Sequence, residues 1–182
     1  VINHKKERLD SVEIVPFKML IENGLGSVMV AHLNIPSLDK TKDLAVSLSP
    51  KVVNGLLKKD LKFKGLVITD ALNMKGVSKF YEPGIVDVKA LLAGNDVLLF
   101  SEDVPEAIKQ IKLAVKNGEI SQSEIDNRCK KILNAKFWMG LSNYQKIDLQ
   151  KVRKEIIISE TKQINNELVE NSLTLLQNYD NL

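Results

Sequence analysis

The chain has 182 residues, of which 44% are hydrophobic and 27% are charged, and 26 basic residues against 23 acidic ones give a net charge of +3. This composition is ordinary for a soluble globular protein of one domain, or of one domain plus a fragment, and the even charge balance disfavours nucleic-acid binding. No run reaches the roughly 18 apolar residues of a membrane span. Because the chain opens on Val1 and not on Met, we expect it to be the interior of a longer protein.

The regular elements alternate along the chain. Apolar spacing, caps and Gly or Pro boundaries predict helices over 11–23, 51–62, 86–94, 104–118 and 121–141, and strands over 26–33, 65–70 and 95–100. Short apolar strands without polar alternation are typical of a parallel sheet covered on both faces, and the intervening helices imply βαβ crossovers. Three strands are few for a closed sheet, so we expect an N-terminal part to be missing.

The composition becomes more polar from about Ser142. We interpret 142–156 as a linker, followed by a helix from Ser159 and a strand over 172–178, "SLTLLQN". Cys129 is the single cysteine of the chain, so an intrachain disulfide and a Cys-based metal cluster are excluded. Its place on an apolar helical stripe predicts a core position. Lys58-Lys59 and Lys130-Lys131 lie in amphipathic patterns and are interpreted as solvated helix faces.

Polar residues follow each predicted strand, at the edge where parallel α/β folds place their active sites. The residues at these three strand ends are His32 and Asn34, then Asp70 and Asn73, then Ser101, Glu102 and Asp103. An Asp that precedes a helix is commonly an N-cap. The local sequence therefore leaves two interpretations of Asp70 open, a helix cap or a carboxylate that does chemistry.

Five segments, in order, resemble glycoside hydrolase family 3. "GLVITDALNMKG" (65–76) resembles the family's nucleophile motif, in which an Asp ends the seventh strand of a (β/α)8 barrel. The other four are "VMVAHLNIPSLD" (28–39), "ALLAGNDVLLF" (90–100), "IDNRCKKILNAKFWMGL" (125–141) and "ELVENSLTLLQN" (167–178). The resemblance implies that residues 1–141 are the C-terminal half of a TIM-type barrel. It implies that 142–182 are a linker and the start of an α/β sandwich domain.

Within the family the chain is similar to the β-N-acetylhexosaminidase branch, since Ala71 stands where the β-glucosidase branch has Trp. The resemblance implies a bacterial-type retaining enzyme in which Asp70 is the nucleophile and forms a covalent glycosyl–Asp intermediate. The substrates it implies are terminal β-N-acetylglucosaminides, such as those of cell-wall recycling. We expect His32, Asn73 and Met74 to contact the sugar, and no metal or organic cofactor to be needed.

The general acid/base is expected outside this chain, in a loop before the sixth strand, so the isolated segment is expected to be inactive. His4 follows that loop in the resemblance, and Glu82, Glu102 and Asp103 are interpreted as solvent-exposed loop carboxylates. The chain is expected to need the missing half of the barrel, in a bacterial cytoplasm or periplasm. The alternatives are a β-glucosidase or β-xylosidase of the same family, a non-catalytic binding module, and an unrelated barrel whose Asp70 is only a cap.

Overall fold

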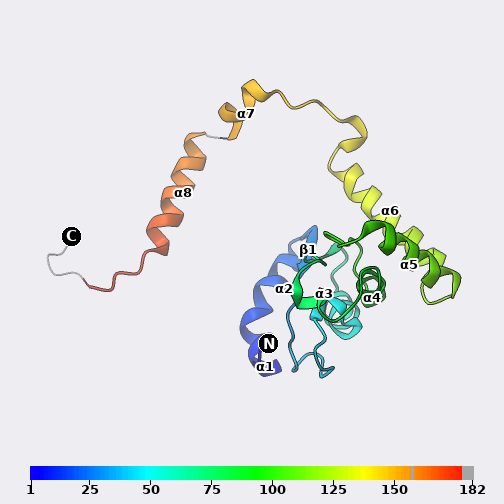
Figure 1. Cartoon of the computed structure of the whole chain (residues 1–182). Helices are drawn as coiled ribbons and strands as arrows, with labels where there is room; N and C mark the ends of the chain where they lie inside the picture. Colours follow the sequence, from blue (N-terminus) through cyan, green and yellow to red (C-terminus); the bar gives the residue numbers. More distant parts are fainter. Residues whose placement is uncertain (157, 178–182) are drawn as a thin grey trace. The chain divides into compact units, whose positions relative to one another are not determined.

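The computed structural model describes residues 1–156 and 158–177 of the chain (Figure 1). The backbone divides into two compact units, Val1–Met139 and Gly140–Leu182, and each is described by itself. Among the described residues, no helix combines the length and the apolar character needed to cross a membrane.

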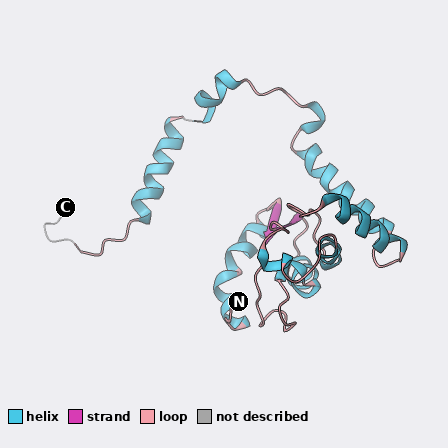
Figure 2. Cartoon of the chain, viewed as in Figure 1, coloured by secondary structure: helices cyan, strands magenta, loops and turns pink. Residues whose placement is uncertain are grey.

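In the first unit, helices alternate with two short strands (Figure 2). The elements in chain order are α1 (Lys6–Arg8), η1 (Leu9–Glu13), α2 (Val15–Glu22), β1 (Ser27–Val30), η2 (Val46–Leu48), η3 (Lys51–Asp60), β2 (Leu66–Thr69), α3 (Lys75–Ser78), α4 (Ile85–Ala93), α5 (Val104–Lys116) and α6 (Gln122–Trp138). The five predicted helices and the first two predicted strands are present in the predicted order, whereas α1, η2 and α3 were not predicted.

The boundary signals of the sequence act as predicted. The Ser49 hydroxyl accepts a hydrogen bond from the Val52 amide at 3.3 Å, at the start of η3. Gly94 ends α4 with a φ of +113°, a backbone conformation that favours glycine. Helix α6 begins with a capping box, in which the Ser121 hydroxyl accepts from the Glu124 amide and the Glu124 carboxylate accepts from the Ser121 amide.

The two strands are parallel, with Ser27 opposite Leu66 and Val30 opposite Thr69. The third predicted strand, 95–100, is reduced to a single bridge between Val97 and Ile68. The Thr69 hydroxyl accepts the Leu99 amide at 2.9 Å, a bond that a backbone carbonyl makes in a regular ladder. One residue later Phe100 has a φ of +53°, outside the extended region, so the pairing ends there.

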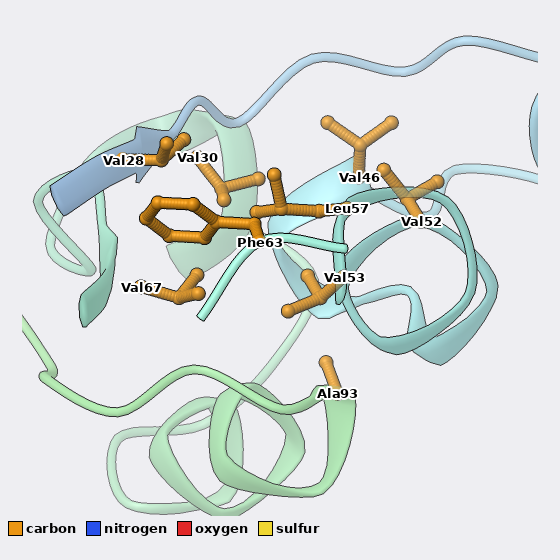
Figure 3. Packing of buried hydrophobic residues seen from close by; sticks show 9 residues of the cluster. All are labelled: Val28, Val30, Val46, Val52, Val53, Leu57, Phe63, Val67 and Ala93. Carbon is orange, nitrogen blue, oxygen red and sulfur yellow. The ribbon is translucent and has the colours of Figure 1, made fainter. Parts of the chain in front are cut away.

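The core lies between one face of the sheet and the helices that follow the strands. Val28, Val30 and Val67 pack against the helical residues Val52, Val53, Leu57 and Ala93 and against Phe63 (Figure 3). The other face of β1 is open, since Met29 is 54% exposed. The prediction that both faces are covered is therefore wrong for β1 in this chain. In a closed barrel the face that carries Met29 lines the interior.

Two predictions about single side chains are wrong. Lys58 and Lys131 do not form solvated faces, because both point to the buried carboxylate of Asp96, at 3.6 Å and 2.5 Å. Cys129 is exposed, since it lies on the side of α6 that faces away from the core. The sequence pattern placed these residues on helices, and the packing of those helices decided which side is covered.

The second unit contains η4 (Leu141–Asn143), α7 (Leu149–Ile156) and α8 (Ser159–Ser172). Helix α7 falls inside the segment predicted to be a linker, whereas α8 was predicted. Residues 173–177 form no regular structure, so the strand predicted over 172–178 is not observed there. The sheet found within the described residues consists of β1 and β2. Residues 178–182, which include the last residue of that predicted strand and the end of the expected second domain, lie outside the described residues.

Candidate active site

Asp70 follows the last residue of β2 and is half-buried. Its amide donates to the Val30 carbonyl at 3.1 Å, so its backbone is tied to the end of the neighbouring strand. Its carboxylate accepts a hydrogen bond from the Ala71 amide at 2.8 Å. The next helix, α3, begins five residues later, after Met74, and has no side-chain cap. The interpretation of Asp70 as a helix cap is therefore not what the structure shows.

The turn that carries Asp70 is anchored by backbone contacts and by one apolar side chain. The Leu72 amide donates to the Leu99 carbonyl at 2.9 Å, and the Met74 amide donates to the Ala71 carbonyl at 3.0 Å. The Leu72 side chain is completely buried in a cluster with Leu48, Val77 and Val86. Leu72 was not among the predicted site residues. Its signal in the sequence was an apolar side chain in the turn that follows the strand.

His32 lies two residues after β1 and joins two loops. One ring nitrogen, Nδ1, is 2.6 Å from the Ser47 hydroxyl, and the other, Nε2, is 3.0 Å from the Ala71 carbonyl. His32 is half-buried and Ser47 is fully buried. The structure therefore brings His32 to the turn that carries Asp70, across 39 residues of sequence.

A cavity of about 190 Å³ lies beside His32. It is lined by Val1, His32, Asn34, Asp43, Ala45, Gly76, Lys79 and Phe80. Asn73 and Met74, the other two residues expected to contact the sugar, are exposed on the turn after Asp70. The Asn73 backbone carbonyl accepts from the Ser78 hydroxyl at 3.3 Å, and the Asn73 side chain lies on the surface.

The residues at the third strand end have structural partners. The Ser101 hydroxyl donates to the buried carboxylate of Asp87. Asp103 accepts from the Glu106 amide at 2.9 Å and caps α5. Glu82 and Glu102 are exposed, as predicted for loop carboxylates. The Thr69 hydroxyl, next to Asp70 in sequence, is bonded to the Leu99 amide.

The described residues contain no group of three or more His, Cys, Asp or Glu side chains that could hold a metal ion. What the site does contain is one carboxylate at a strand end, a histidine that reaches its turn from the preceding strand, and exposed polar residues beyond. Parallel strands in chain order, helices between them and a carboxylate at the C-terminal edge define a segment of a TIM-type barrel with a candidate hydrolytic site.

Comparison with known proteins gives the family. The family model of the glycosyl hydrolase family 3 N-terminal domain matches residues 1–135, and the chain belongs to this family. In structure it is similar to a family 3 β-N-acetylglucosaminidase from Paenibacillus sp. str. FPU-7. The TM-score is 0.85 and the identity 33%, over 98% of this chain and 34% of that one.

Two curated relatives are also similar. Beta-hexosaminidase A of Pseudoalteromonas piscicida is 24% identical over 158 residues, which cover 74% of this chain and 26% of the relative. A beta-hexosaminidase of Hydrogenovibrio crunogenus is 30% identical over 127 residues, which cover 68% of this chain and 34% of the relative. The chain thus spans about a third or less of the length of the relatives it matches.

Proposed function

We propose that the full-length protein is a retaining glycoside hydrolase that removes terminal β-linked N-acetylglucosamine, with Asp70 as the nucleophile. The observation that carries this proposal is the half-buried Asp70 carboxylate at the C-terminal end of β2, on a turn in which it caps no helix. Relatives named as hexosaminidases, and a structural neighbour named as a β-N-acetylglucosaminidase, support the choice of sugar.

In the first step a carboxylate oxygen of Asp70 attacks the anomeric carbon. The bond from that carbon to the leaving oxygen breaks, and the leaving oxygen takes a proton from a general acid. In the second step the same group, now a base, removes a proton from water as the water attacks the anomeric carbon and releases Asp70. We propose that the acid/base comes from outside residues 1–182, so that this chain alone does not turn over.

We further propose that Asn73 and Met74 border the bound sugar, whereas His32, the third residue expected there, has both ring nitrogens bonded within the chain. Residues 1–141 would form the C-terminal half of the barrel and 142–182 the start of a second domain, and the missing half of the barrel would complete the site. The runner-up is a β-glucosidase or β-xylosidase of the same family, which Ala71 disfavours because the resemblance places a Trp there in that branch. A non-catalytic relative that binds glycans is a third candidate.

The test uses the full-length protein, incubated with 4-nitrophenyl N-acetyl-β-D-glucosaminide and, separately, with the matching glucoside. The variant is Asp70→Asn, which keeps the shape of the side chain and removes the charge. The matched control is Asp60→Asn, an exposed carboxylate at the end of η3. We expect the N-acetyl substrate to be cleaved by the wild type and by the control, and the Asp70 variant to lose at least about 10³-fold of kcat.

Cleavage of the glucoside alone would move the protein to the runner-up class. A folded full-length protein that cleaves neither substrate would contradict the proposal and favour the non-catalytic relative. An Asp70→Asn variant as active as the wild type would show that another carboxylate is the nucleophile.

A further inference from the structure

The ring of His32 has a hydrogen-bond partner at each nitrogen, and both partners belong to this chain. The Ser47 hydroxyl is 2.6 Å from Nδ1, and the Ala71 carbonyl is 3.0 Å from Nε2. A carbonyl oxygen can only accept a hydrogen bond, so Nε2 must carry a proton and donate it. The Ala71 carbonyl thereby fixes the tautomer. In the neutral ring Nδ1 then accepts from the Ser47 hydroxyl, which holds the ring in the orientation that reaches Ala71.

The residue that His32 holds is the one that contacts the Asp70 carboxylate. The Ala71 carbonyl accepts from His32 and from the Met74 amide, while the Ala71 amide donates to Asp70 Oδ1 at 2.8 Å. Both polar backbone groups of Ala71 are therefore used, one to secure the turn and one to orient the carboxylate. The two groups belong to adjacent peptide planes that meet at the Ala71 Cα, so a displacement of Ala71 that breaks the first contact also moves the donor of the second.

Packing holds the histidine itself in place. A Cβ atom on Gly76 of α3 would lie 3.1 Å from the Cβ atom of His32, so a side chain at this position would require His32 or the helix to shift by a few tenths of an ångström. Ser47 is fully buried, and its carbonyl accepts from the buried Asn95 side chain at 2.8 Å. The ring is thus supported by α3 on one side and by an immobilised serine on another.

We propose that His32, with its ring held in orientation by Ser47, is a positioning residue for Asp70 and acts through Ala71. The inference rests on the proposed function, in which Asp70 is the nucleophile. It differs from the expectation that His32 contacts the sugar, because the polar atoms of the ring are bonded within the chain. A displacement of about 1 Å of a reacting group costs about 10²-fold in rate, so loss of this contact should be visible in the kinetics.

The experiment compares three variants of the full-length protein with one control. His32→Gln keeps a donor near the position of Nε2, whereas His32→Asn is too short to reach Ala71. Ser47→Ala removes the hydroxyl that orients the ring through Nδ1. The control is Thr41→Val, which removes a different side-chain hydrogen bond from the same loop, the 2.8 Å bond to Asp39.

The readouts are kcat/KM for the N-acetyl substrate and the inhibition constant of free N-acetylglucosamine. We expect His32→Asn to lower kcat/KM about 10²-fold, Ser47→Ala to have a smaller effect, and His32→Gln and Thr41→Val to stay within about fivefold of the wild type. The inhibition constant should stay within about twofold in all of them. A rise of the inhibition constant that matches the loss of kcat/KM would overturn the inference and make His32 a sugar ligand. An equal loss in Thr41→Val would also overturn it, by showing a general effect of the loop.

Hydrogen–deuterium exchange of the peptide that covers residues 70–74 tests the contact without any substrate. We expect faster exchange in His32→Asn and no change in Thr41→Val. If the wild type cleaves no glycoside, the proposed function fails, and the exchange rates still decide whether His32 holds this turn. Unchanged exchange in His32→Asn would overturn the positioning role even in an active enzyme.

Discussion

The ammonium group of Lys131 lies 2.5 Å from the Asp96 carboxylate. This contact joins helix α6 to the start of the third predicted strand, 95–100. The same carboxylate accepts the Val67 amide at 2.9 Å and has Lys58 of η3 at 3.6 Å. Asp96 thus ties two helices and β2 together at the edge of the sheet opposite Asp70. Burial lowers the pKa of the Lys58 ammonium, although the neighbouring Asp96 acts to raise it.

The first prediction concerns removal of this carboxylate. Asp96→Ala leaves the Val67 amide and two partly buried ammonium groups without their partner, so we expect the free energy of unfolding to fall by about 3–5 kcal/mol. Asp60→Ala, at an exposed position, should change it by less than about 0.5 kcal/mol. Urea denaturation of the full-length variants measures both. A loss below about 1 kcal/mol for Asp96→Ala would show that the cluster does not stabilise the fold.

The second prediction is a pH dependence that arises from Asp39, which lies in the loop between β1 and η3. Burial acts to raise the pKa of this carboxyl, but hydrogen bonds from Ser49, Thr41 and Lys51 outweigh it and lower the pKa from 3.8 to about 2. Because the folded pKa lies below the unfolded one, the stability from Asp39 is present above pH 4 and is lost as the pH falls toward 2. A shift of this size is worth about 2 kcal/mol.

The measurement is the free energy of unfolding of the wild type and of Asp39→Asn between pH 2 and pH 6. We expect the wild type to be more stable by about 2 kcal/mol at pH 6, and the difference to shrink steadily below pH 4. Thr41→Val serves as a control, because it removes one donor to Asp39 and keeps the charge. A difference that stays constant down to pH 2 would contradict the assignment to Asp39.

The third prediction compares two glycines that share a left-handed backbone but differ in their surroundings. Gly94 has a φ of +113°, and an added Cβ would meet the Asn54 side-chain oxygen at 2.1 Å, whereas Gly118 has a φ of +77° and nothing within 4 Å. Gly118→Ala should cost about 1 kcal/mol from backbone strain alone. Gly94→Ala should cost about 1–3 kcal/mol, because the exposed Asn54 side chain must also turn aside to relieve the overlap. Thermal unfolding of the two variants checks the difference, and equal losses would mean that Asn54 moves aside freely.

The position of Asp70 at the end of a strand could be predicted from the sequence, because an apolar run that ends on a charge marks a strand end in a parallel fold. The order of elements and the caps at Ser49, Gly94 and Ser121 were equally readable, since these signals are local. They depend on residues within one turn of each boundary, so no knowledge of the tertiary fold is needed.

Contacts between distant segments could not be predicted in this way. The bond of His32 to Ala71 spans 39 residues and that of Lys131 to Asp96 spans 35, and neither spacing is a pattern. The third strand was predicted from an apolar run that the sequence does contain. The structure pairs it less than predicted, since the Leu99 amide donates to the hydroxyl of Thr69, a residue of another strand. The core position predicted for Cys129 was wrong because α6 also carries exposed apolar side chains, such as Phe137, which is 71% exposed. The apolar stripe of the helix therefore did not indicate which side is buried.

The last prediction follows from the open face of the sheet. Met29 is 54% exposed beside the half-buried Leu66 and Ile68, and among the described residues β1 pairs only with β2, so its outer edge has no neighbouring strand. An apolar sheet face next to a free edge favours association between copies. We therefore expect residues 1–182, expressed alone, to self-associate or to be poorly stable.

Analytical ultracentrifugation and thermal melting of the isolated polypeptide test this. Met29→Lys places a charge on the open face and should reduce self-association, because the charge must be desolvated when two such faces meet. Leu133→Lys is the matched control, since Leu133 lies on α6, away from the sheet, and is 56% exposed. A wild-type monomer with a cooperative melt would contradict the prediction. It would mean that this segment is stable with the open face of its sheet in water.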